Sequence, residues 1–239
     1  WHNEAFGTKL NGFGGLDAIL VFKNHLMVRH IAKLSSLVKS RLFIYTGRED
    51  QPEVKFSDGE CAMLTSSSAA HAAIKRNARF DVGVAQLPYY DDVRGAPQNT
   101  IIDGASLWVM AGKKSAEYRG VAKFFAFLTS PEIQADWHQK TGYLPITKAA
   151  YELTKKQGYY DANPITEIAI QQLLLHNPTN DTKGIRLGNF EQISAIIDEE
   201  MESVWNQNKS PKQALDDAVE RGNAELRKFE HANKLEKSV

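Results

Sequence analysis

One stretch, residues 130–151, constrains the fold most, because it contains the residues that set where helices begin and end. Pro131 follows a serine, which is a typical helix start, and Gly142 can adopt the left-handed conformation that ends a helix. Pro145 forces the residue before it into an extended conformation. The sequence therefore predicts a helix, then a stiffened Gly-Tyr-Leu-Pro turn that fixes Tyr143 in space, then a second helix.

The caps of these helices and one shared apolar face can also be predicted. Ser130 and Thr147 have side chains that commonly accept a hydrogen bond from the first turn of a helix. Ile133 and Trp137 are four residues apart, so we expect them to share one face of the first helix. On these residues alone, an ordinary connector with a packed tyrosine explains the turn equally well.

Segments typical of strands alternate with helical ones through the first hundred residues, and helices dominate the rest. We expect β-strands at 20–22, 42–45, 60–65, 80–87 and 100–111. We expect helices at 25–39, around 54–56, after the serine run 66–68, at 115–128, around 168–174, from about 189 and from about 210. This order predicts an α/β architecture with a helical C-terminal part.

Composition excludes several classes of function. The 239 residues are 42% hydrophobic, which is enough to bury a core as one or two domains. Twenty-nine basic residues balance 29 acidic ones, so no net field favours nucleic acid or an anionic membrane as a partner. The single cysteine, Cys61, cannot form an internal disulfide, and no apolar run is long enough to span a membrane.

Catalytic and metal-binding motifs are also missing from the sequence. None of the seven histidines lies in a known metalloprotease or hydrolase motif, and there is no glycine-rich phosphate loop. The adjacent Asp91 and Asp92 are typical of a solvated turn. We therefore expect a protein that is not an enzyme, with no metal and no cofactor.

The serine run at 66–68 follows a predicted strand and precedes a predicted helix. Unpaired N–H groups and the positive end of the dipole make such a helix start suitable for an anion. Plain capping by a serine explains the same pattern and is more frequent. Both interpretations stay open on these residues alone.

Several separated segments resemble the periplasmic sn-glycerol-3-phosphate-binding receptors of bacterial ABC uptake systems. The strongest is Trp-His-Gln-Lys-Thr-Gly-Tyr-Leu-Pro-Ile-Thr at 137–147. Others are Gly-Glu-Cys-Ala-Met with the serine run, Ala-Pro-Gln-Asn-Thr-Ile-Ile, Gly-Ala-Ser-Leu-Trp-Val-Met, Gly-Val-Ala-Lys-Phe, Leu-Gly-Asn and Val-Glu-Arg-Gly-Asn. The similarity runs nearly from end to end.

This resemblance implies a fold of the type II periplasmic-binding-protein kind, with one lobe nearly complete and part of the second. Residues 1–102 and 152–239 would form the C-terminal lobe, and 103–151 would belong to the N-terminal lobe, most of which would lie upstream. The implied function is ligand binding for an ABC importer of sn-glycerol-3-phosphate or glycerophosphodiesters in the periplasm. Its partners would be the ligand and the membrane subunits of the transporter.

The resemblance also implies which residues face the ligand. The receptor family's cleft positions fall on Ser67, Gly104 and Tyr143. Two further cleft positions differ from the family: Ser194 stands where it has a phosphate-binding arginine, and Asp103 stands where it has a glycine. Losing one charge-assisted hydrogen bond costs about 1.5 to 3 kcal/mol, so we expect a weakened phosphate site unless Arg186, Lys183 or a cationic ligand head compensates.

Three alternatives stay open. The chain could belong to a receptor for a neutral sugar or polyol, or be a remnant that binds no ligand, or, as the weakest alternative, be a hydrolase of glycerophosphodiesters. A further expectation concerns surfaces: without the rest of the N-terminal lobe, apolar side chains of 103–151 would be bare and would favour self-association. These are Trp108, Phe124, Phe125, Phe127 and Trp137.

Overall fold

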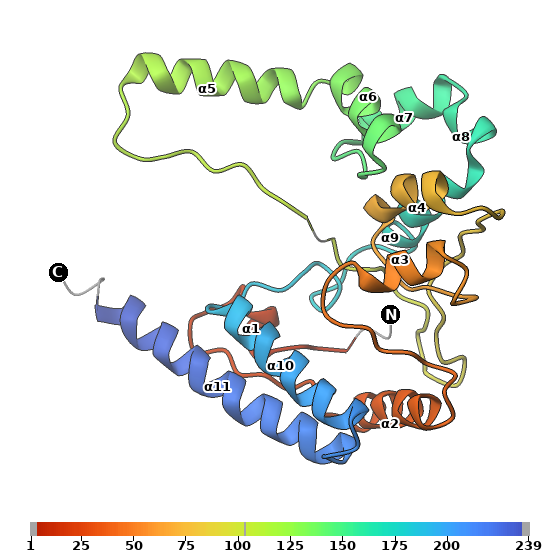
Figure 1. The fold of residues 1–239 in the computed structure, drawn as a ribbon. Coiled ribbons are helices and arrows are strands. Elements are labelled where there is room, and N and C mark those ends of the chain that lie inside the picture. The colour runs from red at the N-terminus through yellow and green to blue at the C-terminus, as the bar shows by residue number, and fades with distance from the viewer. Residues whose placement is uncertain (1–3, 103, 236–239) are drawn as a thin grey trace. The chain divides into compact units, whose positions relative to one another are not determined.

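The computed structural model describes residues 4–102 and 104–235, and helices dominate them (Figure 1). The α-helices are α1 Thr8–Asn11, α2 His25–Lys39, α3 Gln51–Ser57, α4 His71–Asn77, α5 Ser115–Leu128, α6 Pro131–Thr141, α7 Lys148–Lys156, α8 Tyr159–Ala162, α9 Ile168–Leu173, α10 Phe190–Trp205 and α11 Pro211–Leu235. Two short 3₁₀ helices are η1 Ser68–Ala70 and η2 Pro164–Thr166. The expected helices at 25–39 and 115–128 are confirmed at both ends.

The chain forms two compact units. Unit 1 comprises Trp1–Glu49, Tyr89–Ile101 and His176–Val239, and unit 2 comprises Asp50–Pro88 and Ile102–Leu175. The backbone therefore passes between the units more often than the expected lobe boundaries require. The lobe assignment of 1–102 with 152–239 against 103–151 stays a prediction.

The expected β-strands are not found in the described residues. The only β pairing there is an isolated antiparallel bridge between Gly7 and Leu20. The segments 60–65, 80–87 and 104–110 have no regular secondary structure and no ladder partner within that part of the chain. A strand exists only when its backbone N–H and C=O groups pair with a neighbour, so side-chain pattern alone does not produce one. The described residues are thus largely helical and lack the strands that the expected α/β class requires.

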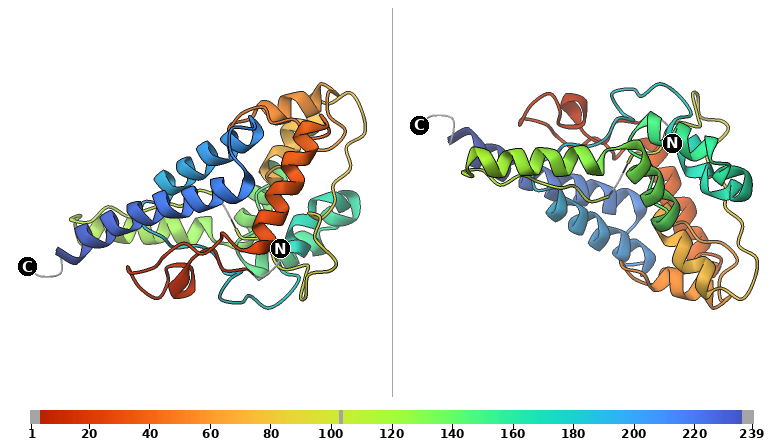
Figure 2. Two further views of the ribbon diagram at one scale, coloured as in Figure 1. Left: turned by 90° about the horizontal axis from the view of Figure 1, so that it is seen from below. Right: turned by 90° about the horizontal axis from the view of Figure 1, so that it is seen from above.

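The core of unit 1 lies where α2, α10 and α11 meet the N-terminal segment, and α10 and α11 run side by side in each view (Figure 2). Leu215, Ala218 and Leu226 form a buried stripe along α11. Gly222 belongs to the same stripe, because a Cβ at this position would lie 2.5 Å from Leu20 Cδ1. The glycine therefore lets the N-terminal segment pack directly on α11.

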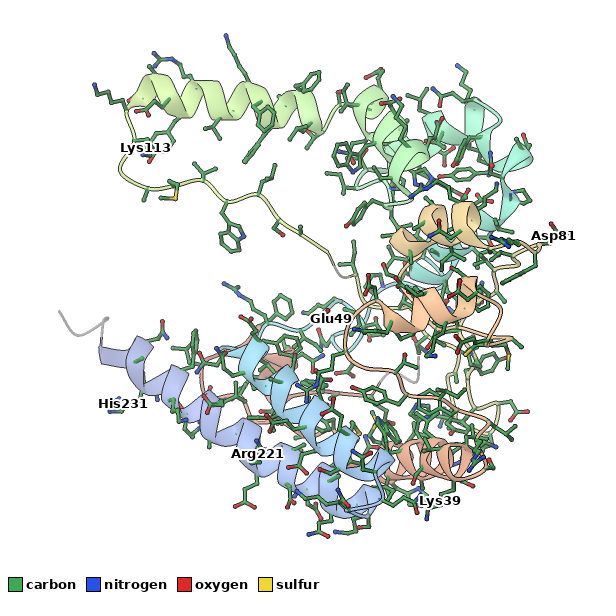
Figure 3. All side chains as sticks on the ribbon, viewed as in Figure 1. Lys39, Glu49, Asp81, Lys113, Arg221 and His231 are labelled. Atoms are coloured by element: carbon green, nitrogen blue, oxygen red, sulfur yellow. The ribbon has the colours of Figure 1, made fainter. Side chains whose placement is uncertain are left out.

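A buried carboxylate ties α10 to α11. Glu200 is only 2% exposed, and its oxygens accept hydrogen bonds from Lys209 Nζ at 2.6 Å and from Arg221 Nη1 at 2.7 Å. Figure 3 labels Arg221 on α11, and its Nη2 also donates to Glu199 on α10. Two cations thus compensate the cost of burying one negative charge.

In unit 2, the helix–turn–helix predicted at 130–151 is confirmed. Helix α6 begins at Pro131 and ends at Gly142, whose φ of 80° is left-handed. Thr147 Oγ1 caps α7 by accepting a hydrogen bond from Ala150 N at 3.2 Å. Ser130 is the N-cap residue as expected, but its hydroxyl does not accept a hydrogen bond from the first turn and instead donates to the carbonyl oxygen of Phe127 at 2.8 Å.

Helix α6 does not bury the face that carries Trp137. Its buried residues are Ala135 and His138, whereas Trp137 is 54% exposed. Trp137 shares this exposure with other apolar side chains of unit 2. We call this set the bare apolar surface: Leu107, Trp108, Val109, Met110, Phe124, Phe127 and Trp137. Trp108 is the extreme case at 90% exposed.

Candidate functional site

The serine run adopts a short 3₁₀ turn before it becomes helical. Ser67 is the residue before η1, and its Oγ accepts a hydrogen bond from Ala69 N at 3.3 Å. The side chain is exposed, so its hydroxyl stays accessible to a ligand. The helix that follows, α4, has only seven residues, which is shorter than predicted and too short for a substantial dipole. Any affinity for an anion here must come from individual hydroxyl and N–H donors.

Tyr143 follows the C-terminal end of α6. The N–H of Gly142 donates to His138 O at 2.9 Å, and the N–H of Tyr143 donates to Thr141 Oγ1 at 3.2 Å. The Tyr143 side chain is 47% exposed, and its hydroxyl has no hydrogen bond to the described residues. The turn thus fixes the backbone of Tyr143 while it leaves the phenol accessible.

The serine turn and the tyrosine turn lie against each other. A Cβ placed on Gly142 would lie 3.2 Å from the carbonyl oxygen of Ser68 and 3.9 Å from the Cα of Ala69. Both segments belong to unit 2. The structure therefore brings Ser67 and Tyr143, which are distant in sequence, to adjoining parts of one unit.

The other expected positions are not brought together in the same way. Gly104 belongs to unit 2 and has a φ of 142°, which favours glycine, but an added Cβ would meet nothing within 4 Å. Asp103 lies outside the described residues. Ser194 is half-buried on α10 in unit 1, so it belongs to a different unit from Ser67 and Tyr143.

One buried histidine beside Tyr143 was not predicted. His138 is 2% exposed, and its ring Nδ1 lies 2.7 Å from the backbone oxygen of Tyr143. Its Nε2 lies 2.9 Å from the hydroxyl of Tyr160, which is also buried. Burial lowers the pKa of the imidazole, while the hydrogen bond to Tyr143 O opposes that shift. The available signal was spacing, since His138 lies three residues after the buried Ala135 and four before Gly142.

The chemistry at this place is that of binding. Ser67 and Tyr143 provide neutral hydroxyl groups that can donate to phosphate or to ligand hydroxyls. The described residues contain no cluster of three or more His, Cys, Asp or Glu side chains that could hold a metal ion. Within the same part of the chain, no helix combines the length and apolarity that a membrane crossing requires.

Comparison with known proteins identifies the family. Residues 3–166 match the family described as bacterial extracellular solute-binding protein. The sn-glycerol-3-phosphate-binding periplasmic protein UgpB of Pectobacterium atrosepticum is 55% identical over 98% of this chain and 53% of its own length. The protein of the same name from Salmonella typhimurium is 56% identical over the same shares.

Solved structures show the same fold. UgpB from Mycobacterium tuberculosis, crystallised with glycerophosphocholine, matches with a TM-score of 0.72 at 24% identity, over 88% of this chain and 51% of that one. The cyclic α-maltosyl-1,6-maltose-binding protein of Arthrobacter globiformis matches with a TM-score of 0.71 at 19% identity, over 93% and 53%. The chain spans about half the length of the curated relatives it matches, 53%. It belongs to the family of bacterial extracellular solute-binding proteins.

Proposed function

We propose that this chain forms part of the periplasmic solute-binding subunit of an ABC importer for sn-glycerol-3-phosphate or glycerophosphodiesters. Its partners are the ligand and the membrane subunits of the importer, whose separate ATPase provides the energy. The protein carries out no reaction and needs no cofactor. Relatives that share more than half of its residues carry the name of a glycerol-3-phosphate-binding protein.

The observation that supports this proposal most is the contact between the serine turn and the tyrosine turn. The two segments were expected to contribute to one cleft, and they are neighbours, since a Cβ added to Gly142 would lie 3.2 Å from Ser68 O. In the proposed site, Ser67 donates its hydroxyl to a phosphate oxygen, and Tyr143 donates its phenol to a second ligand oxygen. Gly104 contributes its backbone.

Two substitutions weaken the phosphate site in this proposal. Ser194 cannot form the bidentate, charge-assisted pair that an arginine forms with phosphate. Asp103 places a negative charge beside Gly104. The loss of one charge-assisted hydrogen bond corresponds to about ten- to a hundredfold lower affinity. Asp103 instead favours a ligand with a cationic head, such as a glycerophosphodiester of choline.

A receptor chimera tests the assignment. In the Salmonella typhimurium relative, the matched region is replaced by this chain, and calorimetry measures binding of sn-glycerol-3-phosphate, glycerophosphocholine, maltose and glycerol. We expect Tyr143→Phe and Ser67→Ala each to lower affinity for the phosphate ligands about tenfold. Tyr89→Phe is the matched control, because Tyr89 is similarly exposed at 49% and belongs to unit 1.

Each alternative predicts a different result in the same chimera. Preference for maltose or glycerol would identify a receptor for neutral ligands, and no binding at all would identify a remnant. Release of the alcohol from a glycerophosphodiester would identify a hydrolase. For the weakened site, Ser194→Arg should raise affinity for sn-glycerol-3-phosphate about ten- to a hundredfold. Micromolar binding that Ser194→Arg leaves unchanged would contradict that part of the proposal.

A further inference from the structure

We propose that His138 is a positioning residue that holds the Tyr143 turn in place through the hydrogen bond from its Nδ1 to the backbone oxygen of Tyr143. The geometry of the turn supports the positioning role, and the consequence for ligand affinity rests on the proposed function. His138 itself does not contact the ligand in this proposal, because its side chain is buried.

The two contacts of the imidazole determine its tautomer. The backbone oxygen of Tyr143 can only accept a hydrogen bond, so Nδ1, at 2.7 Å, must carry a proton. In a neutral ring the other nitrogen, Nε2, is then an acceptor, and the hydroxyl of Tyr160 at 2.9 Å donates to it. His138 therefore links a helix end to a buried tyrosine with both nitrogens satisfied.

The surroundings hold the ring in this orientation. The ring of Tyr159 lies 5.8 Å from the His138 ring at 71°, and the Tyr160 ring lies 5.6 Å from it. The Tyr151 ring packs on Tyr160, with 5.6 Å between the two ring centroids. The Tyr151 hydroxyl donates to Glu167 Oε1 at 2.5 Å. These aromatic contacts, all within unit 2, leave the imidazole little freedom to turn away from Tyr143.

The hydrogen bond from His138 Nδ1 holds the carbonyl of Tyr143, which lies beyond the last hydrogen bond of the helical pattern. Gly142 is held by its N–H bond to His138 O, which continues the helical pattern. Beyond Gly142 that pattern ends, and the carbonyl of Tyr143 is instead held by the His138 side chain. The same residue thus fixes the turn through its backbone and its ring. Without the ring contact, the peptide between Tyr143 and Leu144 would be free to rotate.

Two substitutions separate the two ring contacts. His138→Asn places an amide N–H at the position of Nδ1 and removes the contact with Tyr160. His138→Gln places its amide at the position of Nε2 and removes the contact with Tyr143. A purely structural role predicts equal damage from both variants. Positioning of Tyr143 predicts that the asparagine variant retains the turn and the glutamine variant loses it.

The test uses nuclear magnetic resonance on the whole chain without ligand. We expect the ¹⁵N shifts of His138 to show a protonated Nδ1 and an unprotonated Nε2. We expect amide hydrogen exchange at residues 142–144 to become about tenfold faster in His138→Gln and to stay near wild type in His138→Asn. Tyr160→Phe, which spares Nδ1, should also leave exchange at 142–144 unchanged.

A titration with sn-glycerol-3-phosphate extends the test to the ligand. We expect His138→Gln to weaken binding as much as Tyr143→Phe, and the double variant to be no weaker than either alone, because both act through one phenol. Additive losses would overturn the positioning role, as would a protonated Nε2 or equal exchange in the two His138 variants. If the receptor chimera with the wild-type chain, in which this titration is carried out, does not respond to the ligand, the proposed function is refuted, while the ligand-free measurements would still decide the role of His138.

Discussion

Replacing Gly142 by alanine should disturb the proposed site in two separable ways. The first is backbone strain, because Gly142 has φ 80° and ψ −3°. A left-handed conformation costs an alanine about 1 to 2 kcal/mol, and the smaller entropy of the unfolded chain returns about 0.4 to 1 kcal/mol. The net loss from strain is therefore about 1 kcal/mol. The second is contact, since the new Cβ would lie 3.2 Å from Ser68 O.

Gly158 provides a matched control for the strain alone. It has φ 72° and ψ 14°, and it belongs to unit 2 as well. Its added Cβ would meet only Asp161 Oδ2 at 3.8 Å, which is an ordinary contact. Gly158→Ala should therefore lose about 1 kcal/mol of unfolding free energy. Gly142→Ala should lose about 0.5 to 1 kcal/mol more, because the serine turn must shift.

Urea unfolding of the two variants measures this difference, and amide exchange locates it. We expect exchange at residues 67–70 to change in Gly142→Ala and not in Gly158→Ala. Asparagine tolerates the left-handed conformation better than alanine does, so Gly142→Asn separates strain from contact. Equal stability losses in the two alanine variants, with unchanged exchange at 67–70, would refute the contact between the two turns.

Three further predictions concern other parts of the chain. Glu200→Gln should lower the free energy of unfolding by about 2 kcal/mol, since the buried side chain loses its ion pairs with Lys209 and Arg221. Asp217→Asn, at a more exposed carboxylate, should cost less than about 1 kcal/mol, and urea unfolding compares the two variants. The hydrogen bond from Arg48 and, to a smaller extent, the one from Tyr45 lower the pKa of the Glu202 carboxylate from 4.5 to about 2. This carboxylate therefore stabilises the fold fully above pH 4.5 and loses that effect as the pH falls toward 2; Glu202→Gln should flatten the dependence, and unchanged unfolding curves from pH 5 to 3 would contradict it. Light scattering should show that the wild-type chain self-associates through the bare apolar surface and that Trp108→Lys reduces this association. A strictly monomeric wild type would argue against self-association.

Local signals in the sequence predicted the helix ends well. The helix expected from about residue 210 begins at Pro211, and Ser210 Oγ accepts a hydrogen bond from Gln213 N at 3.2 Å. The end of α6 follows from Gly142. Such features depend on a few adjacent residues, so they can be predicted without knowledge of the rest of the fold. Strands could not be predicted in this way, because each needs a partner from a distant segment.

The candidate site was predictable only in part for the same reason. The exposure of Tyr143 follows from the turn that carries it, whereas its approach to the serine turn is a tertiary contact that no local pattern contains. His138 was missed because a polar residue on an amphipathic helix is usually exposed. Trp137, the preceding residue, is 54% exposed, in line with its place among the apolar side chains expected to be bare.

The charge balance of the proposed site bears on which ligand it prefers. Ser67 and Tyr143 are neutral donors, and each such hydrogen bond contributes about 0.5 to 1.5 kcal/mol. With Ser194 in place of an arginine, neither they nor Ser194 can neutralise a phosphate dianion. A phosphodiester carries one negative charge rather than two, so its transfer from water into a neutral site costs less desolvation free energy. In the proposed function, Asp103 and Ser194 would therefore both favour a zwitterionic diester over a phosphate dianion.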